Sequence, residues 1–164
     1  MALSIKISDT LSLTTGDKIT LQADDGTFLK RFVGARMNIS YGYSQLDRYS
    51  LLMCLQAVAD EFSKFQVTVV DSNRICLKAD NGKYLKRISG ILVDGLSCFI
   101  MDPSSPDEYS YFTVTPKGSN KVTLRADNGQ FLRRYTDVRI ADGKSFIIPN
   151  SIEDGFSLFT VRKA

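Results

Sequence analysis

The chain of 164 residues contains no histidine and no tryptophan. Histidine is the usual general base beside a serine or cysteine nucleophile, and it is the most common metal-binding side chain in proteins. Its absence argues against histidine-dependent hydrolases and nearly all zinc sites. We therefore expect no enzyme, no metal site and no cofactor, and catalysis by carboxylates alone is the chemical alternative that this composition leaves open.

Other features that the chain lacks narrow its class further. No apolar run approaches the length of a membrane span, and the first residues lack the apolar core of a secretory signal. The odd number of cysteines (Cys54, Cys76 and Cys98) favours reduced thiols in the cytoplasm. We expect Cys76 to be a small strand residue rather than a reactive thiol. The net charge of +3 is too mild to favour nucleic acid as a partner.

One stretch of sequence occurs three times in the chain, at residues 21–31, 77–87 and 124–134. Each copy contains an alternating apolar run, an Asp-Gly or Asn-Gly pair, an aromatic residue, a leucine and two basic residues. Alternation with a period of two predicts half-buried strands. An Asp-Gly or Asn-Gly pair between such strands is a strong hairpin signal, because these residue types tolerate the positive φ of tight turns. The repeat therefore predicts three copies of one β-hairpin unit.

A second motif ends each copy and places a phenylalanine two residues before a valine. Its members are Phe65 with Val67, Phe112 with Val114, and Phe159 with Val161. Phe112 lies as far from Phe65 as Phe159 lies from Phe112, so the second and third copies align without a gap. The first copy holds additional residues within roughly 38–50. We expect the repeated phenylalanines and valines to lie in one shared core.

Four strands in each of three copies predict twelve strands in one all-β domain spanning residues 1–164. Three short units that share a core favour a closed barrel capped by hairpins, a β-trefoil, over a solenoid. The predicted repeats are residues 17–70, 74–115 and 121–164. We expect the N-terminal arm, residues 1–16, to contribute one or two strands that partly close the sheet against residues 159–161. Residues 51–60 are the only segment for which we consider a short helix.

The sequence Val-Thr-Leu-Arg-Ala-Asp-Asn-Gly-Gln-Phe-Leu at 122–132, followed by Phe-Thr-Val, resembles the β-trefoil repeats of fascin and hisactophilin. It also resembles the agglutinin domain of amaranthin-like plant lectins, to which the closing motif at 107–114 is most similar. The resemblance covers nearly the whole chain from residue 17 and implies a β-trefoil. The agglutinin comparison implies galactose- or N-acetylgalactosamine-type glycans as ligands and a homodimer. The Gln-x-Trp signature of ricin-type sugar-binding trefoils is absent.

The additional residues of the first copy are the best candidates for a sugar site. They combine aromatic rings, which can stack on the apolar face of a sugar, with planar polar groups that can fix its hydroxyls. Functional insertions on a repeated scaffold also tend to lie in loops. The alternative is a longer hairpin whose tyrosines pack against the end of the barrel. The candidate residues are Asn38, Tyr41, Tyr43, Gln45, Asp47 and Tyr49.

The two basic residues that end each hairpin motif are candidates for contacts with an anionic ligand, through Lys30, Lys86 and Arg133. Such a threefold site would attract sulfated glycans, phosphoinositides or acidic actin through long-range, salt-sensitive forces. Because neighbouring strand residues point to opposite faces, we expect one outward charge from each pair. The alternative is that these charges are solvated or paired across strands near Asp24, Asp80 and Asp127.

These observations lead to a non-catalytic, cytoplasmic, carbohydrate-binding lectin as the predicted function. The alternative is an actin-binding module of the fascin or hisactophilin type. A single trefoil crosslinks filaments only if it dimerises or has two binding faces, so we rank actin binding second. An inhibitor or defence protein that uses one loop as a wedge ranks third.

Overall fold

The computed structural model describes residues 3–33, 50–54, 57–93, 96–101, 105–135 and 145–164. These residues form β-strands, turns and three short 3-10 helices. The 3-10 helices are η2 (Glu61–Ser63), η3 (Glu108–Ser110) and η4 (Gly155–Ser157). Within these ranges, no helix has the length and apolar character needed to cross a membrane.

Each of the three repeats contributes four strands to one twelve-stranded sheet, as the sequence predicts. The first repeat holds β3 (Lys18–Gln22), β4 (Leu29–Val33), β5 (Ser50–Cys54) and β6 (Phe65–Val69). The second holds β7 (Arg74–Lys78), β8 (Leu85–Val93), β9 (Leu96–Met101) and β10 (Phe112–Gly118). The third holds β11 (Lys121–Arg125), β12 (Phe131–Tyr135), β13 (Ser145–Asn150) and β14 (Phe159–Lys163).

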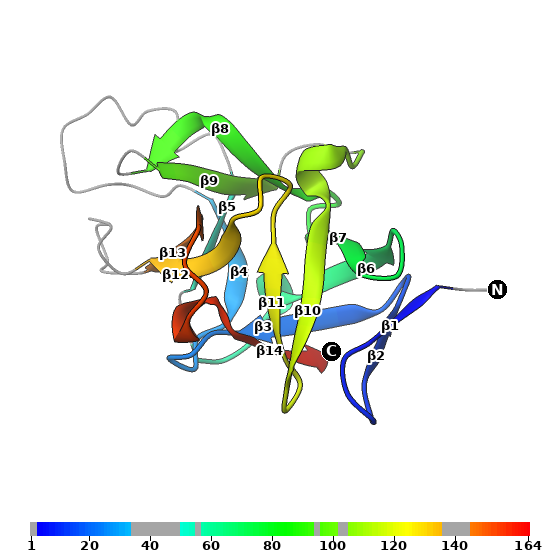
Figure 1. The fold of residues 1–164 in the computed structure, drawn as a ribbon. Coiled ribbons are helices and arrows are strands. Elements are labelled where there is room, and N and C mark those ends of the chain that lie inside the picture. Colours follow the sequence, from blue (N-terminus) through cyan, green and yellow to red (C-terminus); the bar gives the residue numbers. More distant parts are fainter. Residues whose placement is uncertain (1–2, 34–49, 55–56, 94–95, 102–104, 136–144) are drawn as a thin grey trace.

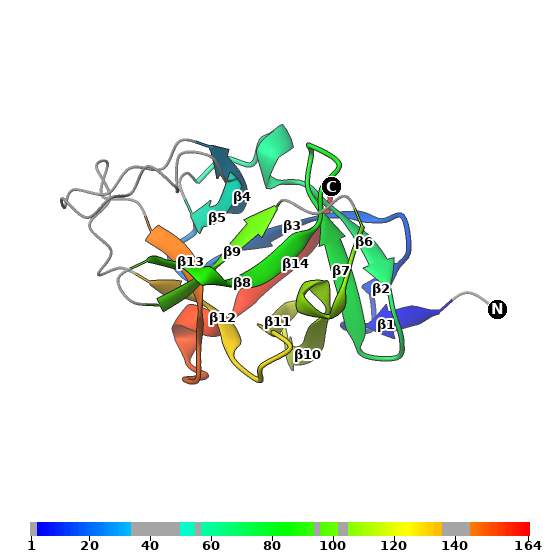
Figure 2. The same cartoon turned by 90° about the horizontal axis from the view of Figure 1, so that it is seen from above.

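The first and fourth strands of the repeats form a closed barrel. Around its ring, β10 pairs with β7, β7 with β6, β6 with β3, β3 with β14, β14 with β11, and β11 with β10. The second and third strands form the hairpins β4–β5, β8–β9 and β12–β13, which join through β5 at one end of the barrel (Figure 1, Figure 2). Closure of the ring pairs the barrel edges. The fold is the predicted β-trefoil.

Corresponding residues of the three repeats fill the core. Phe65, Phe112 and Phe159 are each 0% exposed, and the valines two positions later are also buried. The predicted core role of these phenylalanines and valines is confirmed. The leucine after each hairpin turn is equally buried, and these residues are Leu29, Leu85 and Leu132. One set of side chains from each repeat therefore contributes to a single shared core.

The N-terminal arm differs from its predicted role. Strands β1 (Ser4–Lys6) and β2 (Ser12–Thr14) pair with each other in a separate two-stranded sheet, and β14 pairs with β3 and β11 instead. The hairpin lies at the end of the barrel away from β12 and β13 (Figure 1, Figure 2). It is attached beside β6, where the Val69 amide donates a hydrogen bond to Thr15 Oγ1 at 2.9 Å. The expected closure against residues 159–161 was wrong because β3 already occupies that edge of β14.

The expected short helix at residues 51–60 was also wrong, because Ser50–Cys54 forms β5. Leu52 and Cys54 of this strand are buried, and β5 pairs with both β4 and β13. Pairing on both sides favours strand over helix in this segment regardless of local helix propensity.

Candidate functional site: three clefts between the repeats

Three equivalent open clefts lie where one repeat meets the next, with volumes of about 370, 390 and 350 Å³. We name them by the residue that directly follows the 3-10 helix in each. The Tyr111 cleft is lined by Arg74, Glu108, Tyr111, Thr113, Arg125 and Asp127. The Lys64 cleft is lined by Lys18, Glu61, Lys64, Gln66, Lys78 and Asp80. The Leu158 cleft is lined by Gln22, Asp24, Lys121, Gly155, Leu158 and Thr160.

A 3-10 helix with a repeated cap positions one wall of each cleft. In the first repeat, Asp60 Oδ1 accepts a hydrogen bond from the Phe62 amide at 3.0 Å, and the Ser63 hydroxyl accepts one from the Asp60 amide at 3.3 Å. The same Asp-x-x-Ser capping box occurs at Asp107 and Asp154. Reciprocal capping satisfies donors that the short helix leaves free, so the residue after each buried serine has a fixed direction.

The hairpin turn of the following repeat forms the opposite wall. At the Tyr111 cleft, the Gly129 amide donates a hydrogen bond to the Ala126 carbonyl at 3.0 Å, and Gly129 has a φ of 84°. Asn128 Oδ1 accepts a hydrogen bond from the Gln130 amide at 3.0 Å. Only the glycine of the turn takes the positive φ, while the preceding Asn or Asp braces the turn with its side chain.

An ion pair between repeats fixes the turn aspartate of each cleft. Arg87 donates two hydrogen bonds to Asp127, from Nε to Oδ1 at 2.8 Å and from Nη2 to Oδ2 at 2.9 Å. Arg31 pairs with Asp80 and Arg134 pairs with Asp24 in the same bidentate manner. The hydrogen bond to Asp127 raises the pKa of Arg87, and the equivalent pairing does the same for Arg31 and Arg134. Each pair ties one hairpin to the turn of the next repeat.

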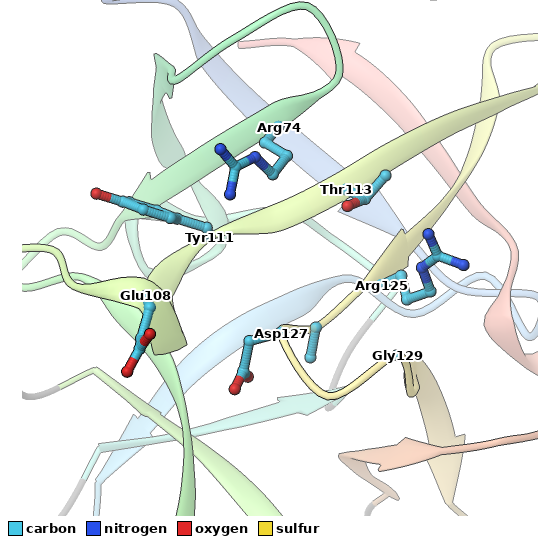
Figure 3. A pocket seen from close by; sticks show the side chains of 8 residues that line it. Arg74, Glu108, Tyr111, Thr113, Arg125, Asp127 and Gly129 are labelled. Atoms are coloured by element: carbon cyan, nitrogen blue, oxygen red, sulfur yellow. The ribbon is translucent and has the colours of Figure 1, made fainter.

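The Tyr111 cleft differs from the others because it contains an aromatic ring. The guanidinium carbon of Arg74 lies 5.3 Å from the centroid of the Tyr111 ring. Asp71 holds Arg74 in place, since Arg74 Nε donates a hydrogen bond to Asp71 Oδ2 at 2.7 Å. Figure 3 shows this ring beside Arg74, with Glu108 coming from the 3-10 helix and Asp127 from the hairpin turn. A fixed aromatic ring can stack on the apolar face of a ligand, and the neighbouring charged and hydroxyl side chains can form hydrogen bonds with hydroxyl groups of the same ligand.

The predicted sugar-binding residues lie outside the described residues. These are Asn38, Tyr41, Tyr43, Gln45, Asp47 and Tyr49, and their role stays a prediction.

The predicted anion-binding residues occupy equivalent places, and each is paired with the capping aspartate of its own repeat. Lys30 Nζ lies 2.7 Å from Asp60 Oδ2, and Lys86 Nζ lies 3.3 Å from Asp107 Oδ2. Arg133 donates two hydrogen bonds to Asp154, at 3.1 and 2.7 Å. These ion pairs give each of the three basic residues a structural partner. Contacts of the three residues with an anionic ligand stay a prediction.

Both members of each basic pair contact the same aromatic ring. Lys30 Nζ and the guanidinium carbon of Arg31 lie 5.3 and 5.4 Å from the centroid of the Phe62 ring. Tyr109 and Phe156 occupy the same place in the other repeats. The expectation of one outward charge per pair was wrong, because these long side chains both bend over the ring and reach their aspartates.

Two of the three thiols are buried in the barrel and its cap. Burial raises the pKa of Cys54 to about 12 and the pKa of Cys76 to about 11. A thiol at such pKa values stays protonated and unreactive near neutral pH, as expected for Cys76. Within the described residues, no cluster of three or more acidic or cysteine side chains is arranged to hold a metal ion.

The clefts were not predicted from the sequence, although one position of the repeat varies in a way that marks them. The position after the capping serine changes from Lys64 to Tyr111 to Leu158, while the motif around it is nearly constant. Variation at one position within a constant frame marks side chains that the fold does not require. These three positions face the hairpin turn of the next repeat because the barrel closes into a ring. The sequence pattern alone does not show this closure.

Comparison with known proteins supports the fold. The chain matches no protein-family model and no curated protein. Its structure is similar to that of a Caenorhabditis elegans protein of unknown function, with 16% identity, a TM-score of 0.69, and coverage of 92% of this chain and 95% of that chain. It is also similar to ThreeFoil, a designed threefold-symmetric protein, with 14% identity, a TM-score of 0.65, and coverage of 88% of this chain and 96% of that chain.

A lectin is also among the similar structures. It is the Polyporus squamosus lectin, bound to a human-type influenza-binding epitope, with 11% identity and a TM-score of 0.65. The match covers 92% of this chain and 50% of the lectin. At such identities the likeness concerns the fold. This protein is therefore a β-trefoil, a fold that is known in a carbohydrate-binding lectin.

Proposed function

We propose that this protein is a carbohydrate-binding lectin that binds a neutral sugar in the Tyr111 cleft. The observation that carries the proposal is the Tyr111 ring fixed beside Arg74 at 5.3 Å, with Glu108 and Asp127 lining the same cleft. A sugar ring needs an aromatic face for its apolar side and oriented polar groups for its hydroxyls. The cleft volume of about 370 Å³ lies in the range of small-molecule sites.

The proposed binding is non-catalytic. Hydrolysis of a glycosidic bond requires two carboxyl groups that are both free to act on the substrate. In the Tyr111 cleft, Arg87 holds Asp127 in a bidentate ion pair. Among the described lining residues, Glu108 is therefore the one carboxylate that is not in an ion pair. This arrangement supports recognition of hydroxyl groups rather than acid–base chemistry.

The finer parts of the proposal come from the sequence. The resemblance to amaranthin-like agglutinins supports galactose or N-acetylgalactosamine as the sugar and a homodimer as the assembly. The odd number of cysteines supports a cytoplasmic location. The actin-binding alternative depends on free charge at the basic pairs, and all six of those residues are ion-paired with aspartates. No observation therefore favours it.

The proposal is tested by screening the purified protein on a glycan array together with three variants. We expect Tyr111→Ala to weaken binding of neutral glycans by about tenfold or more, because stacking is lost, while Tyr111→Phe retains most of it. Leu158→Ala is the matched control, because Leu158 holds the same position in another cleft. We expect this variant to bind like the parent protein.

Two results would count against the proposal in different ways. An array without any bound neutral glycan would exclude the lectin function. Loss of binding in Tyr41→Ala, Tyr43→Ala or Tyr49→Ala, with full binding in Tyr111→Ala, would keep the lectin function and move the site to residues 38–49. Circular dichroism of each variant checks that the fold is intact.

A further inference from the structure

The Lys64 cleft has a different charge from its two equivalents. Lys18, Lys64 and Lys78 line it, and the first two are exposed. The Tyr111 cleft has an aromatic ring at the position of Lys64, and the Leu158 cleft has a leucine there. The Leu158 cleft also replaces Lys78 with the neutral Gln22. Three ammonium groups therefore gather in one of the three clefts.

These lysines lack the ion pairs that neutralise the basic residues elsewhere in the repeats. In the described part of the chain, no acidic side chain lies within ion-pair distance of Lys18, Lys64 or Lys78. Lys78 Nζ instead lies 6.0 Å from the centroid of the Tyr84 ring. By contrast, both residues of every basic pair that ends a hairpin motif are bound to an aspartate.

The acidic residues of the Lys64 cleft do not offset the three charges. Arg31 Nε and Nη2 donate hydrogen bonds to the two carboxylate oxygens of Asp80 at 2.7 and 2.8 Å, so that carboxylate is already neutralised. Glu61 is the other lining carboxylate. The cleft therefore carries an excess of positive charge in a concave site, where attraction for an anion is stronger than on a flat surface.

We propose that the Lys64 cleft binds an acidic saccharide through the sulfate or carboxylate group of the sugar. Its volume of about 390 Å³ lies in the range of small-molecule sites. The amide of Gln66 adds a planar donor and acceptor for a hydroxyl group. That the ligand is a saccharide rests on the proposed function, whereas the requirement for an anionic group rests on the lysines. The protein thus has two chemically distinct sites built on one repeated frame.

The test uses isothermal titration calorimetry with a sulfated heparin-derived tetrasaccharide and its desulfated counterpart. We expect the sulfated form to bind and the desulfated form, which keeps only its carboxylates, to bind more weakly, with affinity falling as the salt concentration rises toward about 0.15 M. The double variant Lys64→Gln/Lys78→Gln should lose about five- to thirtyfold in affinity. The double variant Lys121→Gln/Arg125→Gln removes the same charge from the other two clefts, and it should bind like the parent protein.

Three results would overturn this inference. The first is an equal loss in both double variants, which would show attraction to overall charge. The second is no binding of the sulfated tetrasaccharide at low salt. The third is binding to vesicles containing a phosphoinositide without binding to the tetrasaccharide, which would identify a membrane ligand.

The experiment also separates this inference from the proposed function. Tyr111→Ala should bind the sulfated tetrasaccharide like the parent protein while losing neutral glycans. If no neutral glycan binds the parent protein, but Lys64→Gln/Lys78→Gln selectively loses the sulfated one, the neutral-sugar function fails and the acidic site stands.

Discussion

The aspartates of this protein show how one residue type serves two structural tasks in each repeat. Asp127 in the hairpin turn accepts two hydrogen bonds from Arg87 of the preceding repeat. Asp154 caps a 3-10 helix and accepts two hydrogen bonds from Arg133 of its own repeat. These hydrogen bonds from Arg133 lower the pKa of Asp154 below its ordinary value. The basic residues that end the hairpin motifs are thus ion-paired with aspartates. The lysines of the Lys64 cleft differ from them because they have no such ion pair within the described part of the chain.

Acid stability provides a prediction about Asp17, where the N-terminal hairpin joins the barrel. The Thr14 amide donates a hydrogen bond to Asp17 at 2.9 Å and lowers the pKa of this carboxyl below its ordinary value, with Lys163 Nζ also 3.2 Å away. A lowered pKa in the folded state stabilises the protein above the unfolded-state pKa of about 3.9. This stabilisation is lost as the pH falls through the folded-state pKa.

We therefore expect Asp17→Asn to unfold at a lower temperature than the parent protein at pH 7. The difference between the two melting temperatures should shrink as the pH falls below about 4, toward the lowered pKa of the Asp17 carboxyl in the folded state. Thermal unfolding followed by circular dichroism across this pH range measures the difference. A gap that stays constant from neutral to acidic pH would show that the charge of Asp17 does not contribute.

At the scale of elements, the hairpin turn and the 3-10 helix differ in how well the sequence predicts them. The turn is predictable because an Asp-Gly or Asn-Gly pair between two strands strongly indicates a hairpin. The 3-10 helices were missed, although the Asp-x-x-Ser box that caps them was visible in each copy. A helix of three residues has no hydrophobic period to detect, so only its cap marks it.

Two glycines of these elements give a matched prediction. Gly129 has a φ of 84°, and nothing lies within 4 Å of an added Cβ, so Gly129→Ala meets backbone strain alone. We expect it to destabilise the fold by about 1–2 kcal/mol, the cost of placing a non-glycine residue in the left-handed region. Gly155→Ala also meets open space but without a positive φ, so it should change stability little. Urea unfolding measures both, and an equal effect of the two substitutions would contradict the assigned role of Gly129.

At the scale of the whole molecule, three equivalent ion pairs connect each repeat to the next. They are Arg31–Asp80, Arg87–Asp127 and Arg134–Asp24. Together they close a ring, because the last repeat binds back to the first. Each pair also fixes the turn aspartate in the wall of one cleft. Fold stability and cleft geometry are therefore linked through the same side chains.

A double-mutant cycle on Arg87 and Asp127 tests how much this ion pair between repeats contributes to fold stability. The two side chains are only 13% and 20% exposed, so their interaction is weakly screened by solvent. We expect Arg87→Met with Asp127→Asn to give a coupling energy of about 0.5–3 kcal/mol in urea unfolding. A coupling energy indistinguishable from zero would show that the pair is incidental to stability.

The threefold repeat made the whole-molecule fold predictable, and the site was less predictable for a physical reason. Equal spacing of Phe65, Phe112 and Phe159 required three similar units around one core, which led to the β-trefoil. The N-terminal arm lay outside the repeat, so no symmetry indicated its partner. The clefts form between side chains that belong to different repeats, such as Tyr111 and Asp127. Their juxtaposition depends on barrel closure.

The most direct test of the central claim is a titration of the isotopically labelled protein with galactose and N-acetylgalactosamine, followed by two-dimensional NMR. We predict saturable shifts of backbone amides that line the Tyr111 cleft, including those of Arg74, Tyr111, Thr113 and Gly129. The equivalent amides of the Leu158 cleft should stay unchanged. Shifts confined to residues 38–49, or no saturable shifts with either sugar, would contradict binding of a neutral sugar in the Tyr111 cleft.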